Sequence, residues 1–182
     1  VSFDAGLNHS ISLQLGHTLS TWGSNGFGQL GDGSTTDRYT PGQIWMENNW
    51  RYVSVGTYHT VFLKLNGTLW ITGSNEEGQL GRNATDTCGS FPCLTYPGQV
   101  NSDNDWNSIK EGGGGHHTVA IKSNGTLWAW GRNVEGEIGD GTNVQKNLPV
   151  QIGTNNTWVS TAPGSHDTIA LRSDGTLWGW GE

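Results

Sequence analysis

The chain has 182 residues, of which 29 are glycine and 10 are tryptophan, and its formal net charge is −7. No apolar run reaches the roughly 18 residues that a membrane-spanning helix needs, and the glycines lack the period of three that collagen requires. With 9 Lys and Arg against 16 Asp and Glu and no basic cluster, the composition disfavours a nucleic-acid interface. The chain begins at Val1 without an initiator methionine and ends at Glu182, so we expect either a removed leader or an excerpt of a longer polypeptide.

A repeated unit organises the whole chain. One marker is a glycine followed three residues later by a polar residue, at His9, His59, His117 and Asp167. A second marker is the residue directly before a glycine near the end of a strand-like run, namely Trp22, Thr72, Trp130 and Trp180. These markers predict one domain built of a first repeat over residues 1–50, a second over 51–106, a third over 107–158 and the first half of a fourth over 159–182.

Each unit is predicted to consist of short strands joined by tight turns. Residues 61–65 and 68–71 flank Asn66-Gly67, a strong hairpin signal that predicts positive φ at both turn residues. The second unit is longer than the others, with extra residues between Gly81 and Pro97 and in the glycine run Gly112–Gly115. Short strands at a period near 50 residues indicate β-propeller blades of four antiparallel strands, with the marker tryptophans packed between blades.

The sequence from Gly114 to Thr142, and again from Gly56 to Gly81, resembles the regulator-of-chromosome-condensation repeat. This resemblance implies seven-bladed propellers, in a family that includes a Ran nucleotide exchange factor, secreted β-lactamase inhibitors and many interaction modules. Because the family shares a scaffold, the resemblance implies a fold but not one function. Three and a half repeats make about half of such a ring, so we expect an open arc that more chain or a second subunit completes, or arcs that stack into fibres.

The marker histidines are candidate functional residues, but we interpret them as structural. His9, His59 and His117 occupy equivalent positions in different blades, too far apart to share one metal ion. A buried histidine that hydrogen-bonds a neighbouring segment explains all three, and Asp167 fits the same polar role.

The two cysteines both lie in the insertion of the second repeat. Cys88 and Cys93 are separated by Gly, Ser, Phe and Pro, and further zinc ligands are not evident nearby. The spacing favours a local disulfide, which indicates an oxidising compartment and therefore an extracellular or secreted protein. The same inserted loop provides the most distinctive candidate contact surface, formed by Arg82, Phe91 and Tyr96.

Five N-x-[ST] sequons are candidate glycosylation sites: Asn8, Asn66, Asn83, Asn124 and Asn155. The hairpin turns alone explain Asn66 and Asn124, whereas Asn83 and Asn155 have no such explanation and are the first candidates for N-glycans. The segment Asn101–Asp105 has alternating oxygen ligands like the opening of a calcium loop, but it lacks the downstream glycine and glutamate, so a solvated turn is the better interpretation.

No nucleophile elbow, P-loop or zinc-protease motif occurs, so we expect neither catalysis nor a cofactor. The sequence predicts a non-enzymatic, extracellular propeller protein that acts by protein–protein contact, first of all with further copies of itself, as a structural or filament-forming glycoprotein. The alternatives are a binding propeller for a protein or glycan target, of inhibitor or lectin type, and a guanine-nucleotide exchange factor. The acidic balance and the cysteine pair count against the exchange factor.

Overall fold

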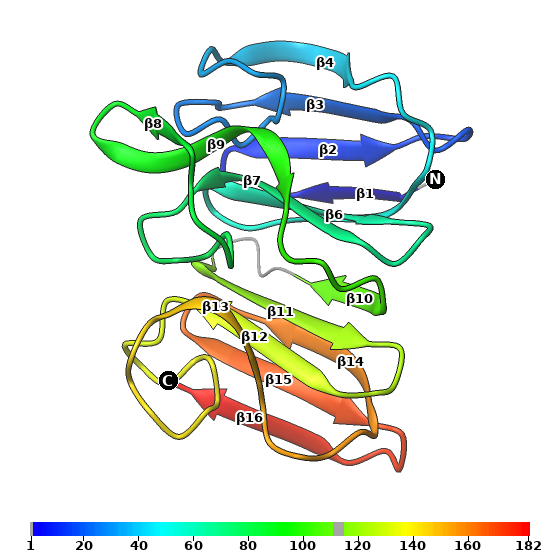
Figure 1. Cartoon of the computed structure of the whole chain (residues 1–182), viewed down its shortest axis with the longest axis vertical. Helices are drawn as coiled ribbons and strands as arrows, with labels where there is room; N and C mark the ends of the chain where they lie inside the picture. Colours follow the sequence, from blue (N-terminus) through cyan, green and yellow to red (C-terminus); the bar gives the residue numbers. More distant parts are fainter. Residues whose placement is uncertain (1, 111–114) are drawn as a thin grey trace.

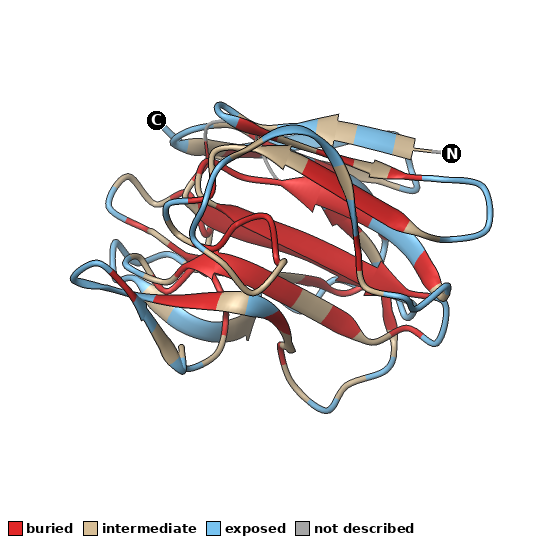
Figure 2. Ribbon diagram, turned by 90° about the horizontal axis from the view of Figure 1, so that it is seen from above, coloured by how far each residue is buried: buried red, intermediate tan, exposed pale blue. Residues whose placement is uncertain are grey.

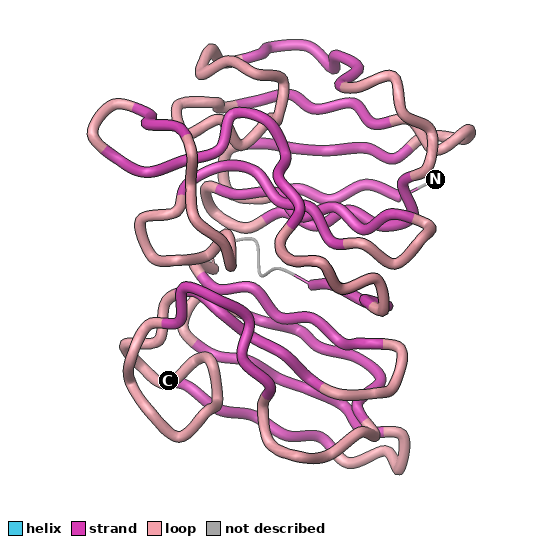
Figure 3. The backbone as a smooth tube through the Cα atoms, in the orientation of Figure 1, coloured by secondary structure: helices cyan, strands magenta, loops and turns pink. Residues whose placement is uncertain are grey.

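A computed structural model describes residues 2–110 and 115–182, and over these residues it contains strands and loops but no helix (Figure 3). Part of the predicted glycine-run insertion, residues 112–114, lies outside the described residues. The strands follow the chain in this order: β1 Ser2–Ala5, β2 His9–Leu13, β3 Leu19–Gly23, β4 Arg38–Ile44, β5 Trp50–Val55, β6 His59–Lys64, β7 Leu69–Ser74, β8 Asp86–Cys88, β9 Phe91–Gln99, β10 Trp106–Lys110, β11 His117–Lys122, β12 Leu127–Gly131, β13 Lys146–Gln151, β14 Trp158–Pro163, β15 Asp167–Arg172 and β16 Leu177–Gly181.

The strands form four separate antiparallel sheets, which we call blades 1 to 4. Blade 1 has the order β1-β2-β3-β4, blade 2 the order β5-β6-β7-β9-β8, blade 3 the order β10-β11-β12-β13 and blade 4 the order β14-β15-β16. The predicted all-β fold with propeller-type blades is therefore confirmed. Blade 2 has a fifth strand because the inserted loop folds into a hairpin of its own, in which Cys88 pairs with Phe91.

The blades stack in an unclosed arc, with β4 at one end and β16 at the other in Figure 1. The first strand of each blade contacts the first strand of the next, so β1 meets β5, β5 meets β10 and β10 meets β14. A hydrophobic cluster fills each junction, and its members come from both blades. Phe62 of blade 2, for example, packs with Ile11 and Leu19 of blade 1.

The alternation of side chains in the strands explains why this packing can repeat. Successive residues of a strand point to opposite faces of its sheet. In β6, Phe62 lies in the cluster shared with blade 1, whereas its neighbours Val61 and Leu63 lie in the cluster shared with blade 3. The second strands of the two inner blades, β6 and β11, are therefore buried on both faces, which Figure 2 shows as buried ribbon through the centre of the molecule.

Blade 4 shows what happens where no next blade follows among the described residues. Leu177 of β16 is 68% exposed, whereas the equivalent Leu69 and Leu127 are fully buried. Ile169 of β15 lies on the same face as Leu177 and is 39% exposed. This outward face of blade 4 therefore carries apolar side chains that an inter-blade junction covers elsewhere in the arc.

The hairpin turns differ from the sequence-based prediction. Gly67 has a φ of 79°, but Asn66 does not have a positive φ. The amide of Gly67 donates to Lys64 O at 3.0 Å, so Leu65 and Asn66 are the central turn residues and Gly67 follows them in the left-handed region. The prediction of two positive φ values was wrong because the loop is longer than the two residues assumed.

The first blade solves the same turn without glycine at the left-handed position. His17 occupies that position with a φ of 62°. Its ring Nδ1 donates to Trp50 O at 2.7 Å, a bond from the hairpin of blade 1 to the first strand of blade 2. Since a non-glycine residue at positive φ is uncommon, this inter-blade bond offers a compensating interaction.

Candidate protein-interaction surface

Because each blade is an antiparallel meander, alternate connections lie on the same side of the arc. We call one side the loop face. It carries the connections between the first and second strands and between the third and fourth strands of the blades, and the β8–β9 hairpin projects from it (Figure 1).

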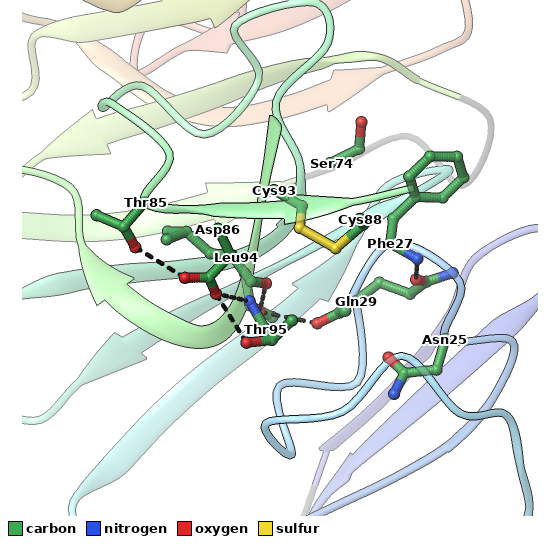
Figure 4. Close-up of a disulfide and its surroundings, with 12 residues drawn as sticks. Asn25, Phe27, Gln29, Ser74, Thr85, Asp86, Cys88, Cys93, Leu94 and Thr95 are labelled. Atoms are coloured by element: carbon green, nitrogen blue, oxygen red, sulfur yellow. Dashed lines mark hydrogen bonds between the residues drawn. A yellow bond between two sulfur atoms is a disulfide. The ribbon is translucent and has the colours of Figure 1, made fainter. Parts of the chain in front are cut away.

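The inserted hairpin is fixed at its base and at its tip. Cys88 and Cys93 form a disulfide with their Cα atoms 5.8 Å apart. The carboxylate of Asp86 accepts bonds from the backbone N–H of Thr95 at 2.9 Å and from its hydroxyl at 2.7 Å (Figure 4). These two hydrogen bonds lower the pKa of Asp86, because they favour its charged form. The hairpin is therefore a rigid element and not a loose loop.

The hairpin strand β9 also joins blade 2 to blade 1. The amide of Gly33 in blade 1 donates to Thr95 O at 3.0 Å. The ring of Tyr96 lies so close to Gly33 that a Cβ there would fall 2.1 Å from Tyr96 Cζ. Only glycine permits this approach, and Tyr96 nevertheless remains 59% exposed.

Four rings from three blades form a continuous series on the loop face, which we call the aromatic chain. Phe91, at the tip of the inserted hairpin, lies 6.0 Å between ring centroids from Phe27 of blade 1. Phe27 lies 4.9 Å from Tyr58 of blade 2, and Tyr58 lies 5.7 Å from His116 of blade 3. Phe91 is exposed and the other three residues are partly buried, so the aromatic chain reaches solvent across two blade junctions.

Acidic side chains border the aromatic chain. Burial lowers the pKa of His116, and the nearby carboxylates of Glu77 and Glu76 oppose that lowering. Among the described residues, neither glutamate forms an ion pair. The nearby cation Arg132 donates to Glu135, through Nη2 at 2.9 Å and through Nη1, and to Glu137 at 2.7 Å.

The structure separates the three residues predicted as the contact surface. Phe91 is part of the aromatic chain and is 39% exposed, and Tyr96 lies over blade 1. Arg82 instead donates to Gln99 O at 2.6 Å and to Asn83 O at 3.3 Å. Its guanidinium therefore braces its own blade. The rings of Phe27 and Tyr58 were not anticipated, because nothing in the sequence shows that they meet Phe91.

The marker histidines lie at the junctions between blades, where each meets a threonine of the next blade. His9 Nε2 lies 2.8 Å from Thr60 Oγ1, and His117 Nε2 lies 2.8 Å from Thr168 Oγ1. The hydroxyl of Thr60 donates its only proton to Gln29 O at 2.7 Å. The imidazole Nε2 must therefore donate to the hydroxyl, which fixes the tautomer of the neutral ring.

The middle junction repeats this arrangement. His59 Nε2 lies 3.2 Å from Thr118 Oγ1, and Thr118 Oγ1 donates to Gln79 O at 3.0 Å. The same carbonyl accepts a bond from Trp130 Nε1 at 2.9 Å. One backbone oxygen of blade 2 thus receives two donors from blade 3.

Burial keeps these histidines uncharged. It lowers the pKa of His9 to about 4 and those of His59 and His117 to about 3. Equivalent threonines follow His59, His117 and Asp167 directly in the sequence, a regularity from which the partner could have been identified.

The marker tryptophans differ in burial according to their blade. Trp130 is fully buried between blades 2 and 3, and Trp180 Nε1 donates to Glu137 O at 2.9 Å across the next junction. Trp22 is half-buried in blade 1, where no preceding blade is present among the described residues. Thr72 replaces the tryptophan in blade 2, and its hydroxyl oxygen lies 2.9 Å from Gly28 O and 2.6 Å from the blade's own Leu94 O.

The opposite side of the arc holds cations between tryptophan rings. Lys64 Nζ lies 4.8 Å from the Trp50 ring and 4.1 Å from the Trp70 ring. Arg172 lies between Trp158 and Trp178 in the same way, at 4.6 and 4.2 Å. These stacks stabilise single blades, and sequence reasoning missed them although each cation stands at the same distance from a hairpin turn.

Lys122 forms the third such stack, and its ion pairs explain the acidic residues of the segment Asn101–Asp105, which resembles the opening of a calcium loop. Its Nζ lies 4.9 Å from Trp106 and 4.7 Å from Trp128. Asp103 binds the same ammonium group at 2.7 Å and Asp105 at 3.0 Å. The carboxylates of this segment therefore neutralise a lysine of their own blade.

One further group of ligand-type side chains occurs among the described residues. Ligand atoms of Glu135, His166 and Glu182 all lie within 4.8 Å of one another on the loop face. The Glu135 carboxylate is already bound by both terminal nitrogens of Arg132, which leaves it poorly suited to a metal ion. We assign no metal to this group.

All five sequon asparagines are exposed. The side-chain oxygen of Asn66 accepts bonds from Thr68 N at 3.1 Å and Thr68 Oγ1 at 2.7 Å, and Asn124 repeats this with Thr126. These two side chains close the hairpin turns. Asn8, Asn83 and Asn155 carry no such bond among the described residues, so the structure leaves their side chains accessible.

Comparison with known proteins agrees with this architecture. The family description "Regulator of chromosome condensation (RCC1) repeat" matches residues 14–63, 66–121 and 124–171, and a second description of the same repeat matches 50–79. The chain belongs to the RCC1 repeat family. Among the described residues, no helix is long and apolar enough to cross a membrane.

Individual relatives of this RCC1-repeat chain are longer proteins. The ultraviolet-B receptor UVR8 of Arabidopsis thaliana is 32% identical over 153 residues, which are 79% of this chain and 32% of the receptor. Prp20p of Saccharomyces cerevisiae, a protein studied for its binding to Gsp1p and histones, has a similar structure with a TM-score of 0.82 at 22% identity, over 93% of this chain and 42% of that one. Human WBSCR16 also has a similar structure, with a TM-score of 0.84 at 20% identity, over 100% of this chain and 47% of that one. The chain thus spans less than half of each.

Proposed function

We propose that this chain is an extracellular protein-interaction module that binds its partner through the aromatic chain on the loop face. The observation that carries the proposal is the series Phe91, Phe27, Tyr58 and His116, which runs across two blade junctions and remains partly exposed. Aromatic residues are enriched at the centres of protein interfaces because they bury a large area at a small cost in side-chain entropy.

The RCC1 family supports a binding role without specifying the partner. UVR8 is named a receptor, and Prp20p is described by what it binds. The same fold therefore serves different partners through the surfaces that it displays. In this chain, the inserted hairpin adds Phe91 to that surface and holds it with the Cys88–Cys93 disulfide.

The proposal assigns no catalytic role to the chain. The histidine–threonine pairs have the composition of a base and a nucleophile, but they are buried inside the blade junctions. The hydroxyl proton of Thr118 is donated to the carbonyl of Gln79 and not to His59. A threonine held in this way is not activated by the imidazole, so the pair is structural.

An extracellular location is part of the same proposal. A disulfide persists in oxidising compartments, and the pair at Cys88 and Cys93 closes an exposed hairpin. The exposed asparagines Asn83 and Asn155 are accessible to N-glycosylation. Both features support secretion and count against a nuclear exchange factor.

Self-association is the second candidate function, and a different observation favours it. The outward face of blade 4 exposes Leu177 and Ile169, whose equivalents are fully buried inside the arc. The edge of β16 also lacks the fourth strand that blades 1 and 3 possess. A second copy or further chain of this family would cover this face, and light scattering of L177S against wild type tests it: a lower mass for the variant supports self-association, and equal masses oppose it.

Photo-crosslinking tests the proposed binding surface directly. Benzoylphenylalanine is placed at Tyr58 in the aromatic chain or at Tyr39, which is 92% exposed on the outer strand β4. In the fluid surrounding the producing cells, we expect the probe at position 58 to form a specific protein adduct and the probe at position 39 to form none. The partner identified in this way should bind F27A/Y58A more weakly than wild type. Equal affinities of that variant and wild type would refute the proposal.

A further inference from the structure

We infer that the aromatic chain, together with Glu76 and Glu77, binds a cationic side chain, lysine or arginine, carried by an extended segment of a partner protein. This inference rests on the proposed function, because it specifies the chemistry of that same surface. It follows from comparing the surface with the sites where this protein already holds cations of its own.

Two of the internal cation sites combine aromatic rings with a carboxylate. Lys64 is stacked between Trp50 and Trp70, and its ammonium group pairs with Glu47 at 2.6 Å. The rings provide a negative face to the cation, and the carboxylate neutralises its charge. Two kinds of side chain therefore suffice to hold a lysine that is otherwise almost fully buried.

The second internal site has the same composition. Lys122 lies between Trp106 and Trp128, and Asp103 and Asp105 both bind its ammonium group. An aromatic pair with one or two carboxylates thus recurs in neighbouring blades, with a cation in place each time.

The loop face has the rings and the carboxylates but no cation of its own. Phe27 and Tyr58 lie 4.9 Å apart at an interplanar angle of 50°, with exposed surface on both. The amide of Asn75, next to Glu76 in the chain, donates to Pro92 O at 2.8 Å beside Phe91, so Glu76 and Glu77 follow at the edge of the aromatic chain. Their charges also oppose the lowering of the pKa of His116 by burial. Among the described residues, no lysine or arginine lies over Phe27 or Tyr58, and the nearby Arg132 is occupied by two other carboxylates.

The cation must come from another protein because this chain has almost none to spare. Seven of the 9 lysines and arginines are engaged in stacks, ion pairs or carbonyl bonds, namely Arg38, Lys64, Arg82, Lys122, Arg132, Lys146 and Arg172. Of the other two, Arg51 already contacts Tyr52 and Asn107, which leaves the exposed Lys110 at the end of β10. A net charge of −7 also attracts a basic partner more strongly than a second copy of this acidic chain.

A peptide titration tests the inference. The probe is a fluorescein-labelled Gly-Ser dodecapeptide that contains three arginines, compared with the same peptide carrying three citrullines, which keep the shape but lose the charge. Fluorescence anisotropy in 150 mM NaCl should give at least about tenfold tighter binding of the arginine peptide, the effect of about 1.4 kcal/mol from a few cation–π contacts. Equal binding of the two peptides would overturn the inference.

Two variants locate the site on the surface. F27L/Y58L/F91L keeps apolar side chains but removes the rings, and E76Q/E77Q removes the charges without changing the shape. Each should weaken binding of the arginine peptide by about five- to tenfold, whereas the controls Y39L and E182Q, at exposed positions elsewhere, should not. Tryptophan fluorescence and circular dichroism verify that each variant is folded. If F27L/Y58L/F91L unfolds, the binding of the arginine peptide to E76Q/E77Q and the comparison with the citrulline peptide still test the inference.

The outcomes separate this inference from the proposed function. If the crosslinked partner loses affinity for F27A/Y58A but binds F27L/Y58L/F91L and E76Q/E77Q like wild type, then the surface docks an apolar partner and the cation site is wrong. If the partner binds the alanine variant unchanged, then the proposed function itself fails.

Discussion

Acidification should unfold this protein through its buried histidines. His9, His59 and His117 have pKa values of about 4, 3 and 3 in the folded chain, because burial at the blade junctions disfavours the charged imidazole. In the unfolded chain, histidine titrates near about 6.5. The histidine contribution to stability is therefore fully present above about pH 6.5 and is lost as the pH falls below it, since the unfolded state then binds more protons.

The magnitude follows from proton counting. Near pH 5, unfolding takes up nearly one proton at each of the three histidines, and each proton changes the free energy of unfolding by about 1.4 kcal/mol per pH unit. The total slope is about 4 kcal/mol per pH unit, and the partly buried His116, whose pKa is also lowered by burial, adds to it. Carboxylates with lowered pKa values, such as Asp140 at about 2, contribute mainly at more acidic pH.

Urea denaturation followed by tryptophan fluorescence measures this slope between pH 5 and 7.5. The variant H117Q keeps an amide donor toward Thr168 but cannot titrate, so its slope should be lower by about 1.4 kcal/mol per pH unit. The control S90A, in the exposed inserted hairpin, should keep the slope of wild type. A wild-type slope below about 1.4 kcal/mol per pH unit, or an unchanged slope in H117Q, would refute the assignment of these histidines as buried and neutral.

Three further predictions concern packing, the disulfide and modification. W130A should lose about 3–5 kcal/mol in chemical denaturation, because it removes a fully buried ring; unchanged stability would contradict the junction packing. C88S/C93S should lose about 2 kcal/mol, the entropy of closing so short a loop, with free thiols absent from wild type in a thiol titration; reactive thiols in the secreted protein would contradict the disulfide. Secreted protein should lose mass on peptide:N-glycosidase treatment, and N83Q/N155Q should lose most of that shift; an unchanged mass would exclude occupied sequons.

The sequence was sufficient for the fold because the repeat constrains it many times over. The same markers occur in the same order in every unit, so the packing between blades inferred for Trp130 also applies to Trp180. The indole of each donates to a backbone carbonyl of the preceding blade. A single unit could not have shown this, since each blade buries its apolar faces only against its neighbours.

The details that failed are those that depend on geometry between units or on the length of one turn. The hairpin at Asn66 and Gly67 was assigned a two-residue loop, whereas a longer loop places only Gly67 at positive φ. Arg82 is predicted on the contact surface because it begins the inserted loop, but its guanidinium donates to the carbonyls of Gln99 and Asn83 in its own blade.

The candidate site was only partly predictable. Phe91 stood out because it lies in an insertion, but Phe27 and Tyr58 look like ordinary positions of their repeats. Their rings meet because three blades bring three different connections together on the loop face. Such a juxtaposition is a property of the arc and has no signature within one unit.

The central claim is that the aromatic chain on the loop face is the binding surface. Isothermal titration of the crosslinked partner against wild type, F27A/F91A and the surface control Y39A/M46A tests it most directly, because Tyr39 and Met46 are large exposed side chains outside the aromatic chain. We predict a loss of affinity of at least about 2 kcal/mol for F27A/F91A, as for interface hot spots, and no change for the control. Equal affinities of the two variants would contradict the account.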